Sequence, residues 1–497
     1  MPTQNKSLAL EAKSAVMWGG GFTMVRDVIQ FANMLVMVRL LTPADYGAFA
    51  LAQSIIGLLS VFSFASFVSH ALQMRDPADV DWQAHFTAAA AINVAIMMIG
   101  LAVATVLYHT EQFAQAALPL AGLSLVFLIE IPSTLRDKML LTQHNWSRSA
   151  YLPIIGTLLG CGVGIAIAIL GGGYWALVLP VLLFGVPAAI DLLLVAKWRP
   201  DWSWSWPRYQ ETAKFGVTLM GSAGLWRARL ATEQHVLAGT YDMSTLGIYS
   251  RSVGLATLLA GRIGTIITGS LFPVLTRAER GSIQFRRYAG LVLRGVSWAT
   301  IPAAAFLAIC AIDVVTLLYG DKWSSVIPLI PFAVAGVALI GISSASTSMI
   351  LANSDVRLCL LLDFFSAVVG VILAFWLIPM GVAAYLAGLV GHGALVMTAS
   401  LFLLWTRNGI SAQSIADAFA PSIVATAAGL IALLLARTAF GSTAPLVLRI
   451  AFEALAMGVV YVITLRLLFA PTLRELVNVA PGSKRLMRML FPETAVA

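Results

Sequence analysis

Residues 39–59 read RLLTPADYGAFALAQSIIGLL, and residues 239–259, 200 positions later, read GTYDMSTLGIYSRSVGLATLL. Gly47 aligns with Gly247, and each copy follows a span that carries polar residues and opens the next one. Because an even number of predicted spans separates the copies, both keep the same orientation in a membrane. A parallel repeat of this kind predicts two lobes related by a pseudo-twofold axis along the membrane normal.

The composition places those lobes in a membrane. Of the 497 residues, 59% are hydrophobic and 11% are charged, whereas a soluble domain carries about 25% charged residues. This composition excludes a soluble enzyme and a disordered chain. Continuous apolar runs such as residues 151–170 indicate helices, because the strands of a membrane barrel would alternate apolar and polar residues. We predict an all-α polytopic membrane protein with about 14 transmembrane helices.

The predicted spans begin near residues 14, 45, 84, 114, 151, 174, 211, 244, 287, 324, 358, 381, 415 and 445. They group into two six-helix lobes and two C-terminal helices. The predicted parts are the N-terminal lobe (1–196), a cytoplasmic amphipathic linker (197–210), the C-terminal lobe (211–404), the last two spans (405–469) and a cytoplasmic tail (470–497).

Basic residues predict the orientation. Most Lys and Arg residues outside the spans fall in alternate connections, and only Arg39, Lys322 and Arg437 fall in the others. The positive-inside rule therefore places both termini in the cytoplasm. The net charge of +8 is then a signal of topology and of affinity for anionic membrane lipids, and we expect no nucleic-acid partner.

The connections between spans are too short to hold a catalytic domain, and no nucleotide-binding or metalloprotease motif is present. The three cysteines, Cys161, Cys310 and Cys359, lie far apart in apolar spans. They suggest neither a disulfide framework nor a metal site. We expect no catalytic residues, no metal and no cofactor, and we interpret the protein as a non-enzyme.

Charged residues inside predicted spans mark the candidate site, because an ion in mid-bilayer costs at least about 2.5–3.5 kcal/mol. They concentrate in the first, second, seventh and eighth spans, which are equivalent pairs in the two repeats. Arginines outnumber acids there, which predicts a cationic cavity suited to phosphate or diphosphate groups. The candidate cavity residues are Arg26, Asp27, Gln30, Asn33, Arg227, Arg229, Arg251 and Arg262.

Several of these residues have a plainer interpretation. Arg229 and Glu233 are four residues apart and can neutralise each other, as can Arg449 and Glu453. Glu130 lies in the apolar run LVFLIEIP, where it is either a hydrogen-bonded core acid or a site of proton or cation coupling. The sequence leaves these alternatives open, and Glu130 and Glu233 are the candidates for coupling.

Five motifs carry a family resemblance. They are RLLTPADYGAFALA (39–52), GGGYWALVLP (171–180), LGIYSRS (246–252), SLFPVLTRAER (270–280) and LLYGDKWSSVIPLI (317–330). In this order and spacing they resemble the polysaccharide-transporter, or Wzx-type oligosaccharide flippase, family. That family belongs to the MOP superfamily, which also holds MATE drug antiporters and lipid II flippases.

The resemblance implies a carrier that moves an undecaprenyl-diphosphate-linked oligosaccharide from the cytoplasmic to the periplasmic leaflet of the bacterial inner membrane. Its product would serve exopolysaccharide, capsule or O-antigen assembly, and its partners would be membrane lipids and a polysaccharide polymerase complex around a monomeric carrier. Lipid II flippases carry cavity arginines in the first and eighth spans, where Arg26 and either Arg251 or Arg262 stand here. Many relatives have an aspartate at the position of Gln234, so the neighbouring Glu233 is a doubtful substitute.

The alternative function is a MATE-like drug or cation exporter. Such an exporter would need acidic cavity residues, and the excess of arginine disfavours it. A glycan polymerase or ligase would need a large periplasmic loop, which the predicted topology lacks.

Overall fold

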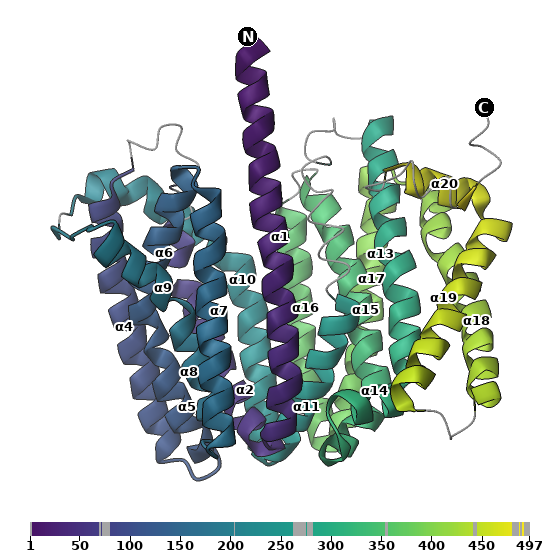
Figure 1. Ribbon diagram of the computed structural model, residues 1–497, viewed down its shortest axis with the longest axis horizontal. Coiled ribbons are helices and arrows are strands. Elements are labelled where there is room, and N and C mark those ends of the chain that lie inside the picture. The colour runs from purple at the N-terminus through teal and green to yellow at the C-terminus, as the bar shows by residue number, and fades with distance from the viewer. Residues whose placement is uncertain are drawn as a thin grey trace. The chain divides into compact units, whose positions relative to one another are not determined.

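The computed structural model describes residues 2–68, 71, 80–202, 204–261, 275, 282–352, 356–440, 445–479, 487, 490 and 491. All regular structure in these residues is helical (Figure 1). By their contacts they form two units, Met1–Ser250 and Arg251–Ala497. The first unit contains α1 (Pro2–Leu40), α2 (Pro43–Leu59), η1 (Ser60–Phe62), α3 (Ala65–Val68), α4 (Trp82–Tyr108), α5 (Ala114–Ser124), α6 (Val126–Thr142), α7 (Trp146–Ile169), α8 (Trp175–Phe184), α9 (Val186–Ile190), η4 (Asp191–Val195), α10 (Trp206–Thr240) and the start of α11 (Met243–Ala256).

The second unit begins within α11. Its further elements are η5 (Thr257–Gly261), α13 (Ile283–Ile309), α14 (Ala311–Leu318), η6 (Asp321–Leu329), α15 (Ile330–Ala352), α16 (Val356–Leu377), η7 (Ile378–Met380), α17 (Val382–Asn408), α18 (Ala412–Phe440), α19 (Leu446–Leu468) and α20 (Ala470–Val479).

Twelve helices among the described residues are long and apolar enough to cross a membrane. The all-helical polytopic fold is thus confirmed, whereas the count of 14 is not. The two other predicted spans fall on α10 and on α11. Helix α10 has 35 residues, but charged side chains such as Arg227 and Arg229 lower its hydropathy. Since α10 packs along α2 and α3, the first unit extends past residue 196, and the predicted division into lobes stays a prediction.

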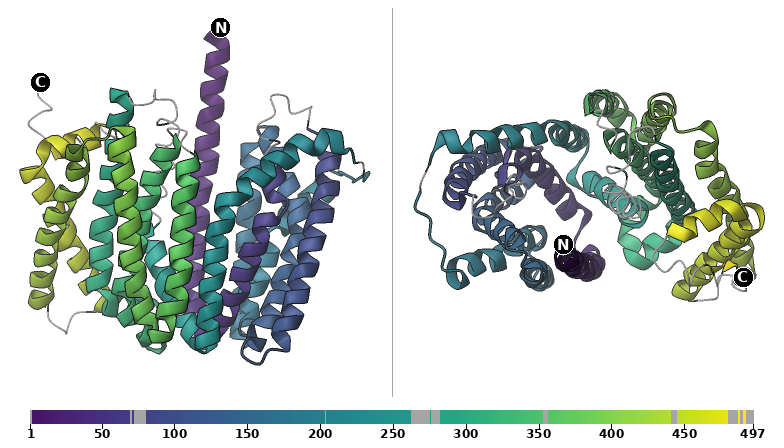
Figure 2. Two further views of the ribbon diagram at one scale, coloured as in Figure 1. Left: turned by 180° about the vertical axis from the view of Figure 1, so that it is seen from behind. Right: turned by 90° about the horizontal axis from the view of Figure 1, so that it is seen from above.

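Within the first unit, α2 packs on α5 and α10, α4 packs on α5 and α6, and α7 lies beside both α1 and α8 (Figure 2). Glycines bring α7 and α8 close together. A Cβ atom on Gly156 would lie 2.1 Å from the carbonyl oxygen of Phe184, and one on Gly164 would lie 2.8 Å from that of Ala176. Small residues at such spacings let membrane helices pack backbone to backbone.

The two copies of the repeat meet where α2 and α11 begin. A Cβ atom on Gly47 would lie 1.7 Å from the carbonyl oxygen of Met243, and one on Gly247 would lie 1.8 Å from that of Pro43. Since positions 43 and 243 are also equivalent in the repeat, the contact is reciprocal, as at an axis of two-fold symmetry. The alignment predicts the equivalence of the glycines, and the structure adds that they touch.

Both helices of this contact are capped by an Asp and a Thr three residues apart. Thr42 precedes α2 in a capping box, in which Asp45 Oδ2 accepts from Thr42 N at 2.9 Å. Asp242 precedes α11, and its Oδ1 accepts from Thr245 N at 2.8 Å. The equivalent positions hold the two residue types in reverse order, and each pair satisfies backbone N–H groups that a helix start leaves free.

In the second unit an ionic cluster joins α14, α18 and α19. Arg437 Nε lies 2.9 Å from Glu453 Oε1, and Arg437 Nη2 lies 3.2 Å from Asp313 Oδ2. Arg449 also binds Asp313. Within the described residues Glu453 therefore pairs with Arg437, and the expected pair of Arg449 with Glu453 is wrong. For Glu453 the partner is Arg437 of α18, and for Arg449 it is Asp313 of α14, so each residue pairs with a neighbouring helix and not with the residue one turn away on α19.

The amphipathic helix α20 covers one end of α13 and α19. Its side chains Leu473 and Val477 are buried. On its other face Glu475 accepts from Arg287 Nε at 3.1 Å and from Arg294 Nη1 at 2.5 Å. Burial alone would raise the pKa of Glu475, but the hydrogen bonds and charges of these arginines outweigh burial and lower that pKa.

This lowered pKa predicts how the docking of α20 depends on pH. A carboxyl group whose pKa falls on folding stabilises the folded state above its unfolded pKa, and that contribution is lost as the pH falls through the folded value. We expect α20 to be protected from proteolysis at neutral pH and to lose protection below about pH 4. The variant Glu475→Gln should be sensitive already at pH 7, and Asp321→Asn, at an exposed site, is the control. Full protection of Glu475→Gln at pH 7 would contradict the expectation.

Candidate functional site

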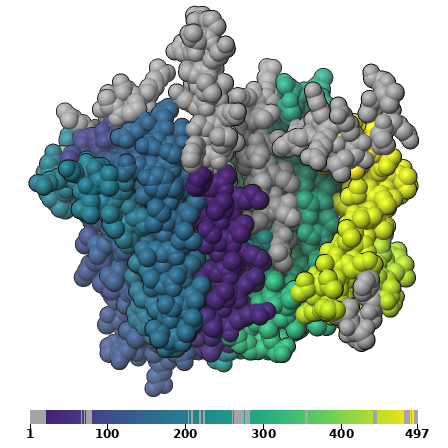
Figure 3. Space-filling model, viewed as in Figure 1, coloured from purple at the N-terminus to yellow at the C-terminus, as the bar shows by residue number. Residues whose placement is uncertain are grey.

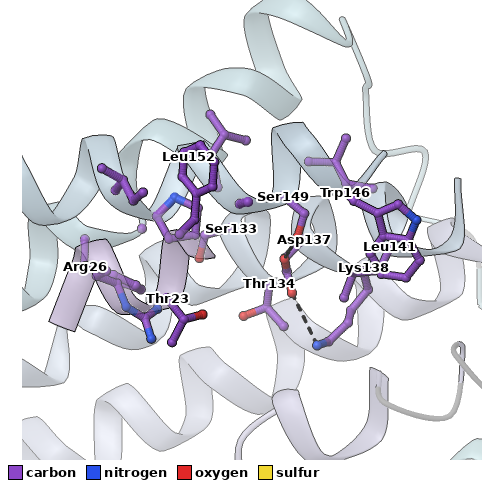
Figure 4. Close-up of a pocket in the computed structure, with 18 of the residues that line it drawn as sticks. Thr23, Arg26, Ser133, Thr134, Asp137, Lys138, Leu141, Trp146, Ser149 and Leu152 are labelled. Carbon is purple, nitrogen blue, oxygen red and sulfur yellow. Dashed lines mark hydrogen bonds and ion pairs between the residues drawn. The ribbon is translucent and has the colours of Figure 1, made fainter. Parts of the chain in front are cut away.

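A cavity of about 660 Å³ lies within the first unit, between α1, α6 and α7 (Figure 4). The end of α8 and the start of α9 close it with Phe184 and Ala188. Helix α1 is otherwise little covered, since only 11% of its predicted span is buried. In Figure 3 the described part of α1 (purple) lies open beside α7 (blue).

Cationic and hydroxyl groups from three helices converge on this cavity. Helix α1 contributes Thr23 and Arg26, α6 contributes Thr134, and α7 contributes Ser149. The Arg26 guanidinium forms no ion pair with a described acidic residue, and its buried Nε has no hydrogen-bond partner there. Figure 4 shows Arg26 and Thr23 at one end of the group, with Thr134 farther along it. A basic group with unused donors in an otherwise neutral wall favours an anionic ligand.

At the other end of the cavity an acid and a base neutralise each other. Lys138 Nζ lies 3.3 Å from Asp137 Oδ2, and Ser149 Oγ donates to Asp137 Oδ1 at 2.8 Å. Trp146 completes this end, and its buried Nε1 has no hydrogen-bond partner among the described residues (Figure 4).

A tight turn between α6 and α7 brings these groups together. His144 takes a left-handed conformation with φ of 56°, and Asn145 caps α7 by accepting from Arg148 N at 3.3 Å. The chain therefore reverses within a few residues, so the first turn of α7 lies beside the last turns of α6.

Glu130 lies on α6, one turn before the cavity wall. Its Oε1 accepts from Ser63 Oγ at 3.2 Å, and its Oε2 accepts from Asn93 Nδ2 at 3.3 Å. Both partners are neutral and fully buried, and Glu130 forms no ion pair within the described residues. Ser63 stands at a break in the second span, where the backbone is extended and Phe64 N donates to Asn93 Oδ1 at 2.9 Å.

The predicted residues of the first span separate in the structure. Arg26 lines the cavity, Asp27 is half-buried, and Gln30 is exposed. Asn33 is also half-buried, and its Oδ1 has no hydrogen-bond partner among the described residues.

On α10 the structure distinguishes the two arginines. Arg229 Nη1 lies 3.5 Å from Glu233 Oε2, and Glu233 also accepts a hydrogen bond from Tyr249. This buried acid is thus held by a base and a phenol. Arg227 is exposed, with its guanidinium 5.5 Å from the ring centre of Trp226, and it forms no ion pair in the described part of the chain.

The remaining predicted residues do not complete the site. Arg251 belongs to the second unit, where its carbonyl oxygen accepts from Tyr319 at 3.4 Å. Arg262 lies outside the described residues. The cavity shared by the first, second, seventh and eighth spans stays a prediction.

Sequence reasoning missed several residues of the first unit. Asn93 and Trp146 received no role, although a lone asparagine in the apolar run AINVAIMM is a signal of a buried hydrogen-bond network. Asp191 received no role either. The structure buries Asp191, with its Oδ2 2.6 Å from Arg136 Nε and its Oδ1 2.9 Å from Arg148 Nε. These arginines are 55 and 43 residues away in sequence, so no local pattern shows the cluster.

Comparison with known proteins identifies a matching family and several distant relatives. A family described as "Polysaccharide biosynthesis protein" matches residues 36–328, more than half of the chain. The "Succinoglycan biosynthesis transport protein ExoT" of Rhizobium meliloti (strain 1021) is 23% identical over 61% of this chain and 61% of that protein. The chain thus matches less than two thirds of that relative's length. The "Lipopolysaccharide biosynthesis protein WzxC" of Escherichia coli (strain K12) is 19% identical over 70% of this chain and 72% of that protein.

Solved structures agree on the fold. "Lipid II flippase MurJ, inward closed conformation" matches with a TM-score of 0.72 at 12% identity, covering 92% of this chain and 100% of that one. An inward-facing MATE multidrug transporter of the MOP superfamily matches with a TM-score of 0.52 at 16% identity, covering 80% of this chain and 98% of that one. These structural likenesses show a fold shared with the MOP superfamily, and by the matched residues the chain belongs to the polysaccharide biosynthesis protein family.

Proposed function

We propose that the protein is a flippase that moves an undecaprenyl-diphosphate-linked oligosaccharide repeat unit from the cytoplasmic to the periplasmic leaflet of the bacterial inner membrane. The product would serve the assembly of exopolysaccharide, capsule or O-antigen. Membership of the family supports a role in polysaccharide biosynthesis, and the succinoglycan relative is named a transport protein. Both termini would be cytoplasmic, and a monomeric carrier would deliver its product to a polymerase complex.

Arg26 is the observation that carries this proposal. It is a guanidinium within a membrane-spanning helix, it lines a cavity, and it has no ion pair with a described acid. A diphosphate cannot cross hydrocarbon unless protein groups replace its hydration. Arginine suits this task because its fork of N–H donors matches phosphate oxygens and it stays charged.

The proposed path is a cationic central cavity that opens first to one side and then to the other. Arg26, Arg227 and Arg251, with Arg262 of the eighth span, would receive the diphosphate, and polar groups would receive the sugars. The polyprenyl tail would remain in lipid, so only the headgroup needs a polar route. Rocking of two lobes related by an internal repeat is the usual means of such alternating access.

Of the two acids considered for coupling, the surroundings favour Glu130. Glu233 already neutralises Arg229. Glu130 has only the neutral partners Ser63 and Asn93, of which Ser63 stands at the break in the second span. Gain or loss of a proton at Glu130 would change these hydrogen bonds, and broken membrane helices commonly accompany coupling sites.

Complementation tests the proposal. The chain is expressed in a bacterium that lacks its own flippase, and surface polysaccharide is measured at matched protein level. We expect rescue by the unchanged chain, loss with Arg26→Ala and Glu130→Gln, and partial rescue with Arg26→Lys, which keeps the charge without the fork. Arg466→Ala, at an exposed arginine of α19, is the control and should rescue fully. Full rescue by Arg26→Ala would contradict the cationic site, and drug export without rescue would favour the MATE-like alternative.

A further inference from the structure

We propose that the cavity between α1, α6 and α7 is a subsite for a glycosyl phosphate, with Arg26 binding the phosphate and Trp146 stacking on the sugar. This inference rests on the proposed flippase function and names the part of the headgroup that the first unit recognises. The site lies wholly within that unit. Arg26 also belongs to the proposed diphosphate path, so the subsite adds to that path a sugar contact made by the first unit alone.

The size of the cavity fits one compact polar ligand. Its volume of about 660 Å³ falls inside the range of about 300–1,000 Å³ that holds small molecules in proteins. Residues of α1, α6 and α7, the α8–α9 junction and Ala65 of α3 line it, and it is partly open to the outside.

The distribution of charge in the cavity determines the orientation of the ligand, with the phosphate at the Arg26 end and the sugar at the Trp146 end. Lys138 is neutralised by Asp137 at 3.3 Å, so the uncompensated positive charge of the cavity is that of Arg26. A phosphate would gain charge-assisted hydrogen bonds at the Arg26 end and none of that strength at the other. Thr23 lies beside Arg26 at the same end of the cavity (Figure 4).

The other end has the groups that a sugar ring needs. An indole presents a broad apolar face together with an N–H donor, and the C–H face of a pyranose can cover that surface. Trp146 lines the cavity, and because its Nε1 is buried, the ring face is the part that a sugar would meet. The Asp137 carboxylate and the Thr134 hydroxyl can accept hydrogen bonds from sugar hydroxyls at the ring edge.

The subsite also lies close to the acid assigned to coupling. Ser133 lines the cavity and donates through Oγ to the carbonyl oxygen of Glu130 at 3.4 Å. One helical turn of α6 thus connects the cavity wall to the Ser63–Asn93–Glu130 network. A ligand that moves this turn would disturb that network, which links occupancy of the subsite to the break in the second span.

A thiol reporter tests the subsite in the full-length membrane protein. Ala188→Cys places the reporter in the cavity wall, and Gln143→Cys places a control reporter at the same end of the unit but exposed. Alkylation rates are measured with glucose 1-phosphate, N-acetylglucosamine 1-phosphate, inorganic phosphate or a polyprenyl-diphosphate-linked saccharide. We expect sugar phosphates to slow alkylation at position 188 at least about threefold, with no effect at 143. This corresponds to occupancy of about two thirds of the sites.

Two variants assign the ends of the ligand. Adding Trp146→Ala should abolish protection by sugar phosphates while protection by inorganic phosphate remains, and Arg26→Ala should abolish both. Trp405→Ala, an exposed tryptophan of α17, is the control and should change neither. Protection by the lipid-linked saccharide alone would identify the membrane as the source of the ligand, whereas equal protection by free sugar phosphates would identify a soluble source.

The outcomes separate this inference from the proposed function. Rescue of surface polysaccharide without any protection at position 188 would overturn the subsite and leave the flippase proposal standing. Protection that requires Trp146 and Arg26 in a chain that rescues nothing would support the subsite and contradict the flippase.

Discussion

Replacing Gly47 by alanine should abolish export of polysaccharide and destabilise the protein. The new Cβ atom would lie 1.7 Å from the carbonyl oxygen of Met243, whereas an ordinary van der Waals contact of a Cβ atom is 3.4–4 Å long. Either α2 or α11 would have to move, and the atom in the way is backbone, which cannot rotate aside. We expect a cost at the upper end of the range of about 1–3 kcal/mol for overpacking. The measurements are surface polysaccharide in complemented cells and the thermal midpoint of the purified protein.

The reciprocal geometry gives this prediction an internal check. Gly247→Ala meets the carbonyl oxygen of Pro43 at 1.8 Å, so it should reproduce the defect of Gly47→Ala. Gly162→Ala on α7 is the matched control, because no atom lies within 4 Å of the added methyl group. If the Gly47→Ala protein matched the Gly162→Ala protein in midpoint and export, the contact between the two repeats would be wrong.

Removing the buried carboxylate of Asp191 should destabilise the first unit by about 3–5 kcal/mol, the usual cost of leaving a buried charge without its partner. Asp191 is 4% exposed and neutralises Arg136, which is 6% exposed. It also accepts from Arg148 and so joins η4 to both α6 and α7. In Asp191→Ala both arginines would lose their shared carboxylate, and the charge of Arg136 would stay buried without a partner.

The experiment compares Asp191→Ala and Asp191→Asn with Asp321→Ala, which removes an exposed carboxylate. The readout is the fraction of monodisperse protein after heating in detergent. The asparagine variant keeps the shape but not the charge, so it should be nearly as unstable as the alanine variant. Stability of Asp191→Asn equal to that of the unchanged chain would show that hydrogen bonding, and not charge, holds this cluster.

The fold class could be predicted well from the sequence because membrane-spanning helices are recognised by their apolar composition and their length. Twelve of the expected spans recur as apolar helices. Of the two exceptions, α10 carries Arg227, Arg229 and Glu233, whose charges lower its hydropathy, and the rest of the span that begins with α11 lies outside the described residues. The repeat was also visible in sequence, since Gly47 and Gly247 are 200 residues apart in matching contexts.

The site was predicted less well, because its partners are distant in sequence. Arg229 and Glu233 lie on one helix, and their pairing was open to prediction from spacing alone. Asp191 with Arg136, and Glu453 with Arg437, depend on how separate helices pack. One end of the cavity depends on a turn at His144, which places Trp146 beside Asp137. A turn of this kind leaves no periodic pattern in the sequence from which it could be predicted.

Translocation by the purified protein in lipid vesicles tests the central proposal most directly. A polyprenyl-diphosphate-linked oligosaccharide is placed in the outer leaflet, and the fraction protected from an added glycosidase is followed over time. We expect protection to rise with the unchanged chain and with Arg466→Ala. With Arg26→Ala it should rise at least about tenfold more slowly, as expected for loss of a hydrogen bond to a charged group. If the unchanged chain is folded and monodisperse but protection rises no faster than in protein-free vesicles, the proposed translocation is contradicted.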